Sequence, residues 1–157
     1  MKRTSDAQAR EEFFNEMGER FHDKVISVEM VCLEAEDEVF ALLKLKPVQK
    51  QSGLWGLLII GENDLYFYAH PSESPLLGLF RAASNGKPPV EQMCSFAVFK
   101  SRRIYRVEKR GLFGKRYDKY LLAVDAVLQD DTELVFFIRT QNSAQDVTEK
   151  LAHLTGN

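Results

Sequence analysis

Short apolar runs separated by turn residues recur through most of this sequence and constrain its fold more than any other feature. Five of them are rich in β-branched or aromatic residues, at 54–60, 65–69, 103–109, 120–128 and 134–138. Strands of this length joined by turns predict an antiparallel sheet. We therefore expect a mainly β, α+β fold, built as a sandwich or a partly open barrel and not as a doubly wound parallel sheet.

Two further strands are predicted near the start of the chain. Residues 25–28 and 39–43 are apolar and strand-like, and the acidic segment 34–38 reads as the turn that joins them. The intervening residues 29–33 contain Glu, Met and Leu, so they fit a helix equally well. With both strands counted, the sheet has seven strands.

A helix is predicted at each end of the chain. Phe13, Met17 and Phe21 recur every four residues and form one apolar stripe, which either the main body or a second copy of the chain must cover. Asn142 or Ser143 caps the last helix. The length of 157 residues fits one domain at 25–157, preceded by a helical extension at 1–24.

The segment 70–92 is predicted to be a long connection because it contains four of the five prolines. An apolar stretch lies within it, and exposed apolar surface usually marks an interaction site. The alternative is that this stretch folds back over an open sheet edge. Together with the N-terminal stripe it supplies the candidate partner contacts, which are Leu76, Leu77, Leu79, Phe80, Phe13, Met17 and Phe21.

Charge is distributed in blocks. The chain has 21 basic and 23 acidic residues, which argues against a surface built for nucleic acid, yet residues 97–119 contain nine basic and only two acidic ones. Leu112 and Phe113 fall at a glycine-bracketed turn inside this block and suit shallow membrane insertion. The alternative is a solvated face whose charges pair with the acidic blocks on either side. The candidate contacts to an anionic surface are Lys100, Arg102, Arg103, Arg106, Lys109, Arg110, Lys115 and Arg116.

The chain resembles the pleckstrin-homology-like superfold, in particular its GRAM-like and bacterial members. The resemblance is carried by residues 56–68, Gly-Leu-Leu-Ile-Ile-Gly-Glu-Asn-Asp-Leu-Tyr-Phe-Tyr, and by the three strands and helix that end the chain. It covers roughly residues 25–155 and implies a non-catalytic module with a C-terminal capping helix. Members that bind phosphoinositides carry Lys and Arg around the first strand pair, where this chain has the acidic segment 34–38.

Nothing in the sequence predicts catalysis, a cofactor, a metal site or a small-molecule substrate. The three histidines are far apart, and a Cys94–His70 pair is the only nucleophile and base that can be imagined. Two cysteines without close spacing indicate a reducing compartment. A polar N-terminus without a signal-peptide pattern gives the cytoplasm as the expected location.

The sequence favours a binding or scaffold module that recognises a protein or a second copy of itself. The alternative is a peripheral membrane module that binds anionic lipid through residues 100–119.

Overall fold

The computed structural model describes residues 2–47, 53–69 and 91–154, with the side chains of the first helix described from Ala7 onward. Its elements are α1 (Lys2–Phe21), β1 (Val25–Glu34), α2 (Asp37–Leu42), β2 (Gly53–Gly61), β3 (Leu65–Ala69), β4 (Gln92–Ser95), the 3-10 helix η1 (Phe96–Val98), β5 (Ser101–Gly111), β6 (Gly114–Val127), β7 (Glu133–Thr140) and α4 (Ala144–Leu151).

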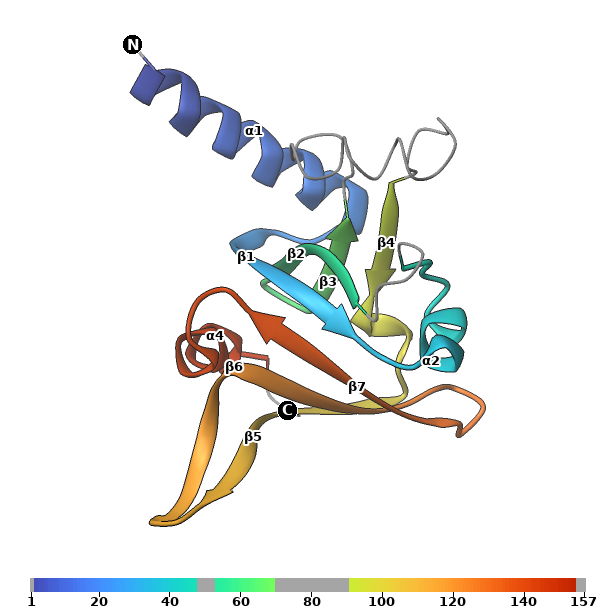
Figure 1. The fold of residues 1–157 in the computed structure, drawn as a ribbon. Coiled ribbons are helices and arrows are strands. Elements are labelled where there is room, and N and C mark those ends of the chain that lie inside the picture. Colours follow the sequence, from blue (N-terminus) through green and yellow to red (C-terminus); the bar gives the residue numbers. More distant parts are fainter. Residues whose placement is uncertain (1, 48–52, 70–90, 155–157) are drawn as a thin grey trace, which may run out of the picture.

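The seven strands form one open antiparallel sheet in the order β4-β3-β2-β1-β7-β6-β5. Figure 1 shows β2, β3 and β4 at one end of the molecule and β5 and β6 at the other, with β1 and β7 between them. The prediction of a mainly β fold with seven antiparallel strands and a C-terminal helix is confirmed. The strands are hydrogen-bonded into one continuous sheet and not into the two separate sheets of a sandwich.

The main core lies on one face of this sheet. Apolar side chains alternate along each strand, so one set points inward and meets α2, η1 and α4. Ser143 caps α4 as predicted, because its hydroxyl accepts a hydrogen bond from the Asp146 amide. The largest side chains of this core with less than 2% exposure are Leu33, Phe40, Leu58, Ile60, Leu65, Phe67, Phe96, Leu122, Phe136 and Ile138.

A smaller apolar cluster lies on the opposite face of β1, β2 and β3, where α1 covers the sheet. Met17 is only 1% exposed and packs in one cluster with Ile59, Tyr66 and Tyr68. Of the two covers considered for the N-terminal stripe, the chain's own sheet is therefore the one observed. The N-terminal half of α1 extends beyond the sheet (Figure 1), and beyond α1 the outer face leaves large apolar side chains exposed at Met30, Trp55, Val135 and Phe137.

The predicted strand at 39–43 is wrong, because these residues belong largely to the helix α2 and the turn that follows it. Asp37 and Glu38 occupy the first turn of this helix, where carboxylates interact favourably with the helix dipole. Phe40 turns into the main core with 1% exposure. The acidic segment therefore starts a helix and is not a hairpin turn.

The seventh strand is instead β4, a four-residue edge strand paired with β3 that the sequence did not predict. Residues 29–33, for which a helix remained an alternative, continue β1.

Candidate functional site

The β5–β6 hairpin projects from the body of the protein (Figure 1), and its sequence explains why it forms. Gly111 pairs with Gly114 across the two strands, so Leu112 and Phe113 make a two-residue loop. Gly114 has a φ of +113°, a conformation that glycine adopts at little cost. The turn predicted within the basic segment is thus the tip of a long hairpin.

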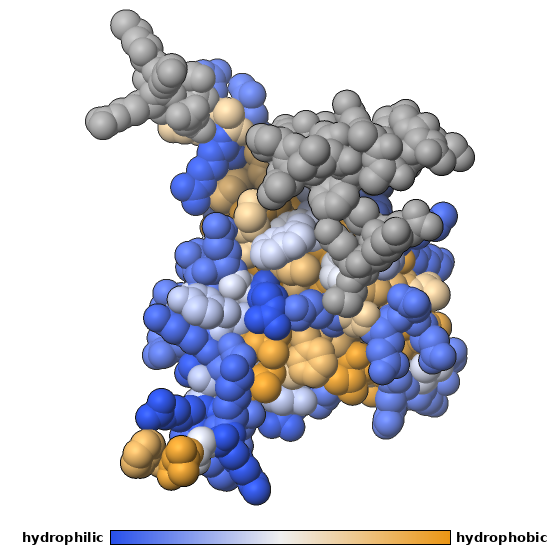
Figure 2. All heavy atoms as spheres, in the orientation of Figure 1, coloured by the Kyte–Doolittle hydropathy of each residue, from blue (hydrophilic) through white to orange (hydrophobic). Residues whose placement is uncertain are grey.

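The hairpin tip, defined here as residues 108–117, makes no contribution to the core, since each of its residues is exposed. Leu112 is 99% exposed and Phe113 is 90% exposed, the highest values of any large apolar side chain in the part of the chain that the structure describes. Figure 2 shows these hydrophobic side chains at the end of a strongly hydrophilic hairpin. Nothing on the described chain covers them.

Three of the candidate cations, two near the base of the hairpin and one in its tip, are engaged by acidic residues of the same chain. Lys100 lies 2.5 Å from the carboxylate of Asp131, and Arg102 lies 2.9 Å from that of Asp64. The Lys109 ammonium lies 3.0 Å from Asp118. For these three, the structure bears out neutralisation by neighbouring charges, which was the alternative to a functional basic surface.

Two more arginines stack on tyrosine rings. The guanidinium of Arg103 lies 4.7 Å from the centroid of Tyr105, and that of Arg106 lies 4.7 Å from the centroid of Tyr117. Such cation–π contacts contribute about 0.5–1 kcal/mol at exposed sites. These side chains are held in place, although their positive charge is not cancelled.

Arg110, Lys115 and Arg116 differ from the other five candidates. Within residues 2–47, 53–69 and 91–154, none of the three forms an ion pair. Arg110 pairs directly across the hairpin with Lys115, and Lys109 pairs with Arg116. Like charges in directly opposed positions of a sheet are destabilising, so folding alone does not favour this arrangement. An external anion would relieve it.

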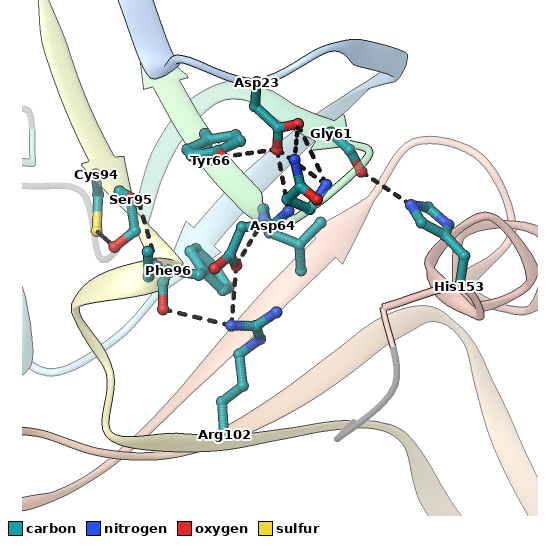
Figure 3. A network of polar contacts seen from close by, with 12 residues as sticks. Asp23, Gly61, Asp64, Tyr66, Cys94, Ser95, Phe96, Arg102 and His153 are labelled. Atoms are coloured by element: carbon teal, nitrogen blue, oxygen red, sulfur yellow. Dashed lines mark hydrogen bonds and ion pairs between the residues drawn. The ribbon is translucent and has the colours of Figure 1, made fainter.

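A polar network anchors the base of the hairpin to the rest of the sheet (Figure 3). It starts at Asp23, which lies in the link between α1 and β1 and is 8% exposed. The Asp23 carboxylate accepts hydrogen bonds from the Asn63 and Asp64 amides and from the Tyr66 hydroxyl, the last at 2.7 Å. The link after α1 is therefore tied to the turn between β2 and β3.

The protonation of Asp23 follows from these bonds. Burial favours the neutral acid, but the hydrogen bonds from Tyr66, Asn63, Asp64 and the Lys24 amide favour the carboxylate more strongly. The pKa of Asp23 is consequently lower than the ordinary 3.8. The pKa of Tyr66 is raised above its ordinary value. Burial is the larger cause, and the hydrogen bond that the hydroxyl donates to Asp23 is the second.

Asp64 extends the network to β5. Its carboxylate holds Arg102, whose guanidinium also donates to the Phe96 carbonyl at 3.5 Å. On the other side of the turn, the His153 ring lies 2.8 Å from the Gly61 carbonyl oxygen. Arg102, one of the eight predicted surface contacts, thus links β5 to the turn between β2 and β3 and to η1.

The predicted partner contacts fall in two groups. Leu76, Leu77, Leu79 and Phe80 lie outside the described residues. The N-terminal stripe packs within the chain: the Phe13 ring lies 6.1 Å from that of Tyr68, and Phe21 stacks on Tyr66. Self-association through this stripe stays a prediction, and it would require α1 to leave the sheet.

The thiol considered as a nucleophile is buried. Burial raises the pKa of Cys94 to about 11, and it raises that of Cys32 to about 11 as well, with Glu34 adding to the effect there. His70 lies outside the described residues, so the structure does not test the Cys94–His70 pairing. Among the residues that the structure describes, no helix has the length and apolar character needed to cross a membrane.

No family model, curated protein or solved structure matches this chain.

Proposed function

We propose that this chain is a non-catalytic binding module whose β5–β6 hairpin docks on an anionic membrane surface. One observation carries the proposal: the two most exposed large apolar side chains, Leu112 and Phe113, share a hairpin tip with three cations that form no ion pair within the described chain. A tip of this composition fits the boundary between lipid headgroups and acyl chains.

The magnitudes favour a lipid surface that is both charged and penetrable. Each Lys or Arg near an anionic leaflet contributes about 1 kcal/mol, so Arg110, Lys115 and Arg116 together contribute about 3 kcal/mol. Full burial of Leu112 or Phe113 contributes about 1.5–3 kcal/mol each. Neither term alone gives firm attachment, whereas their sum supports reversible binding. A nucleic-acid duplex would use the cations but would leave the two apolar side chains in water.

The sequence favoured a protein partner or a second copy of the chain, with contacts in the segment 76–80 and at the stripe of Phe13, Met17 and Phe21. The segment lies outside the described residues, and the stripe packs on the chain's own sheet. The exposed hairpin tip combines apolar and basic side chains, which suits an anionic membrane surface. We therefore place the membrane alternative ahead of the protein partner.

We also infer a pleckstrin-homology-like architecture. The strand order β4-β3-β2-β1-β7-β6-β5 and the packing of α4 into the main core support this assignment. Residues 56–68, which carried the resemblance, form part of β2, a polar turn and part of β3. In such a fold the basic hairpin lies at a different place from the connection after the first strand, where this chain is acidic.

Vesicle co-sedimentation of the full chain tests the proposed function. We expect binding to phosphatidylcholine vesicles that contain phosphatidylglycerol, little binding to pure phosphatidylcholine, and weaker binding as salt is raised. The variant R110E/K115E/R116E removes binding, and L112S/F113S weakens it while retaining the salt dependence.

A matched control separates the hairpin from net charge. The variant K24E/K44E/K46E changes the net charge by the same amount at exposed lysines outside the hairpin, and it should retain most of the binding. Equal loss of binding in both triple variants, or no binding by the natural chain to anionic vesicles at low salt, would falsify the proposal.

A further inference from the structure

The two residue pairs that precede the Gly111–Gly114 pair carry cations on both faces of the hairpin. In a two-stranded ribbon, side chains of directly opposed residues lie on the same face, and successive pairs alternate between faces. Arg110 and Lys115 form one opposed pair, and Lys109 and Arg116 form the next. Two cations therefore lie on each face, immediately behind the apolar Leu112–Phe113 loop.

Acidic residues lie farther from the Leu112–Phe113 loop than the basic pairs do, one on each face. Glu108 is two residues behind Arg110 on its strand, and Asp118 is two residues behind Arg116 on the other, which is about 7 Å nearer the body in each case. The ion pair between Lys109 and Asp118 is consistent with both residues lying on the second face. On both faces the order along the hairpin is apolar loop, basic pair and acidic residue, and on the second face the acidic residue is paired with Lys109.

From this arrangement we infer that the hairpin enters the membrane tip first and recognises the surface charge of a bilayer of monovalent anionic lipids, without a binding pocket for one headgroup. The inference rests on the proposed function. With the loop inserted, Arg110, Lys115 and Arg116 reach the headgroup layer, and Glu108 and the Lys109–Asp118 ion pair lie behind them. A hairpin lying flat would bring one acidic residue to the anionic surface and turn two cations away from it.

The arrangement also identifies the kind of ligand. The tip residues are exposed on a protruding two-stranded ribbon, so Arg110, Lys115 and Arg116 are spread around a convex tip and do not converge on a single phosphate. Convex cation clusters respond to the density of charge on a surface. A bilayer supplies that density together with an apolar layer for Leu112 and Phe113, and a free anion does not.

Two charge-reversal variants, one for each face, test the orientation on phosphatidylcholine vesicles containing phosphatidylglycerol. R110E/K115E alters one face and K109E/R116E the other, with the same change in net charge. Tip-first insertion predicts that each variant weakens binding at least about tenfold, with the larger loss for R110E/K115E because Lys109 is already paired with Asp118. All four positions are exposed, and circular dichroism checks that both variants fold.

Fluorescence quenching by brominated lipids gives a second readout. Trp55 is the only tryptophan and lies on the outer face of β2, so its emission in the natural chain should not be quenched. The variant W55F/F113W should be quenched strongly on the same vesicles. Inorganic phosphate should displace the protein no more than sodium chloride of equal ionic strength does.

The outcomes distinguish this inference from the proposed function. If the natural chain binds anionic vesicles but only one of the two face variants is impaired, the hairpin lies flat and the inference is wrong, while membrane binding stands. Displacement by phosphate beyond the effect of ionic strength also overturns it, because it indicates a headgroup pocket. If the natural chain binds no vesicles, the proposed function itself fails.

Discussion

The ring of Phe21 lies stacked on the ring of Tyr66, with 4.4 Å between their centroids and 19° between their planes. The hydroxyl of the same tyrosine donates to Asp23 at 2.7 Å. Tyr66 therefore holds the end of α1 through its ring and the following link through its hydroxyl. Docking of the N-terminal helix and ordering of the turn between β2 and β3 are coupled through this one side chain.

Replacing Asp23 should destabilise the fold in a pH-dependent way. The pKa of Asp23 is below its ordinary 3.8, so its carboxylate stabilises the folded state above that pH, and the contribution is lost as the pH falls through the lowered folded-state value. D23N should cost about 1–3 kcal/mol near neutral pH. Denaturant unfolding at a series of pH values should show the difference from the natural chain shrinking in acid. A difference that is constant with pH would contradict this account.

Met17 and Met30 provide a matched pair for the packing of α1. Met17 is 1% exposed on the face of α1 that packs on the sheet, whereas Met30 is 48% exposed on the open part of the sheet. M17A should reduce the free energy of unfolding by about 2–5 kcal/mol because it leaves a cavity. M30A should change it by no more than about 0.5 kcal/mol. Similar losses in the two variants would mean that α1 does not dock as described.

Arg102 and Arg110 should have opposite phenotypes although they share a strand. R102Q leaves Asp64 without its cation at a half-buried position, so we expect a loss of about 1–3 kcal/mol in stability. R110Q should leave stability within about 0.5 kcal/mol and weaken binding to anionic vesicles. Thermal unfolding and co-sedimentation, measured on both variants, check the two expectations. A stable R102Q or a destabilised R110Q would reverse these assignments.

The two thiols should be slow to react in the native protein. Burial raises the pKa of both Cys32 and Cys94 to about 11, so little thiolate is present at mildly alkaline pH. With Ellman's reagent we expect slow labelling of the native chain and rapid labelling of two thiols after unfolding in guanidinium. Rapid stoichiometric labelling of a native thiol would show that it is accessible.

Much of the fold was readable from local pattern. The alternation of Tyr66 and Tyr68 with Leu65, Phe67 and Ala69 separates correctly into the α1 side and the main core. Pattern failed where the burial of one side chain decides the element: Phe40 is buried from a helix of six residues, although Val39 and Phe40 themselves favour a strand. Pattern also failed at β4. This edge strand has four residues and is held by its pairing with β3, so its own sequence carries too short a pattern to predict it.

The candidate site divides in the same way. The glycine-bracketed turn and the block of nine cations are visible in the sequence, and both belong to one hairpin. Which cations are neutralised is not visible, because Asp64 and Asp131 approach Arg102 and Lys100 only after folding. The role of Asp23 could not be predicted from the sequence, because the residues that donate hydrogen bonds to it across the fold are 40 to 43 positions away.

The exposed hairpin tip has an evolutionary consequence. Its residues bury nothing, so substitutions there are nearly free of the folding constraints that act on Phe67 or Leu122. Selection can therefore alter the composition of the tip, and with it the surface that the tip recognises, without altering the scaffold. Related chains should keep the hairpin's length and its glycines while the residues between and beside them diverge.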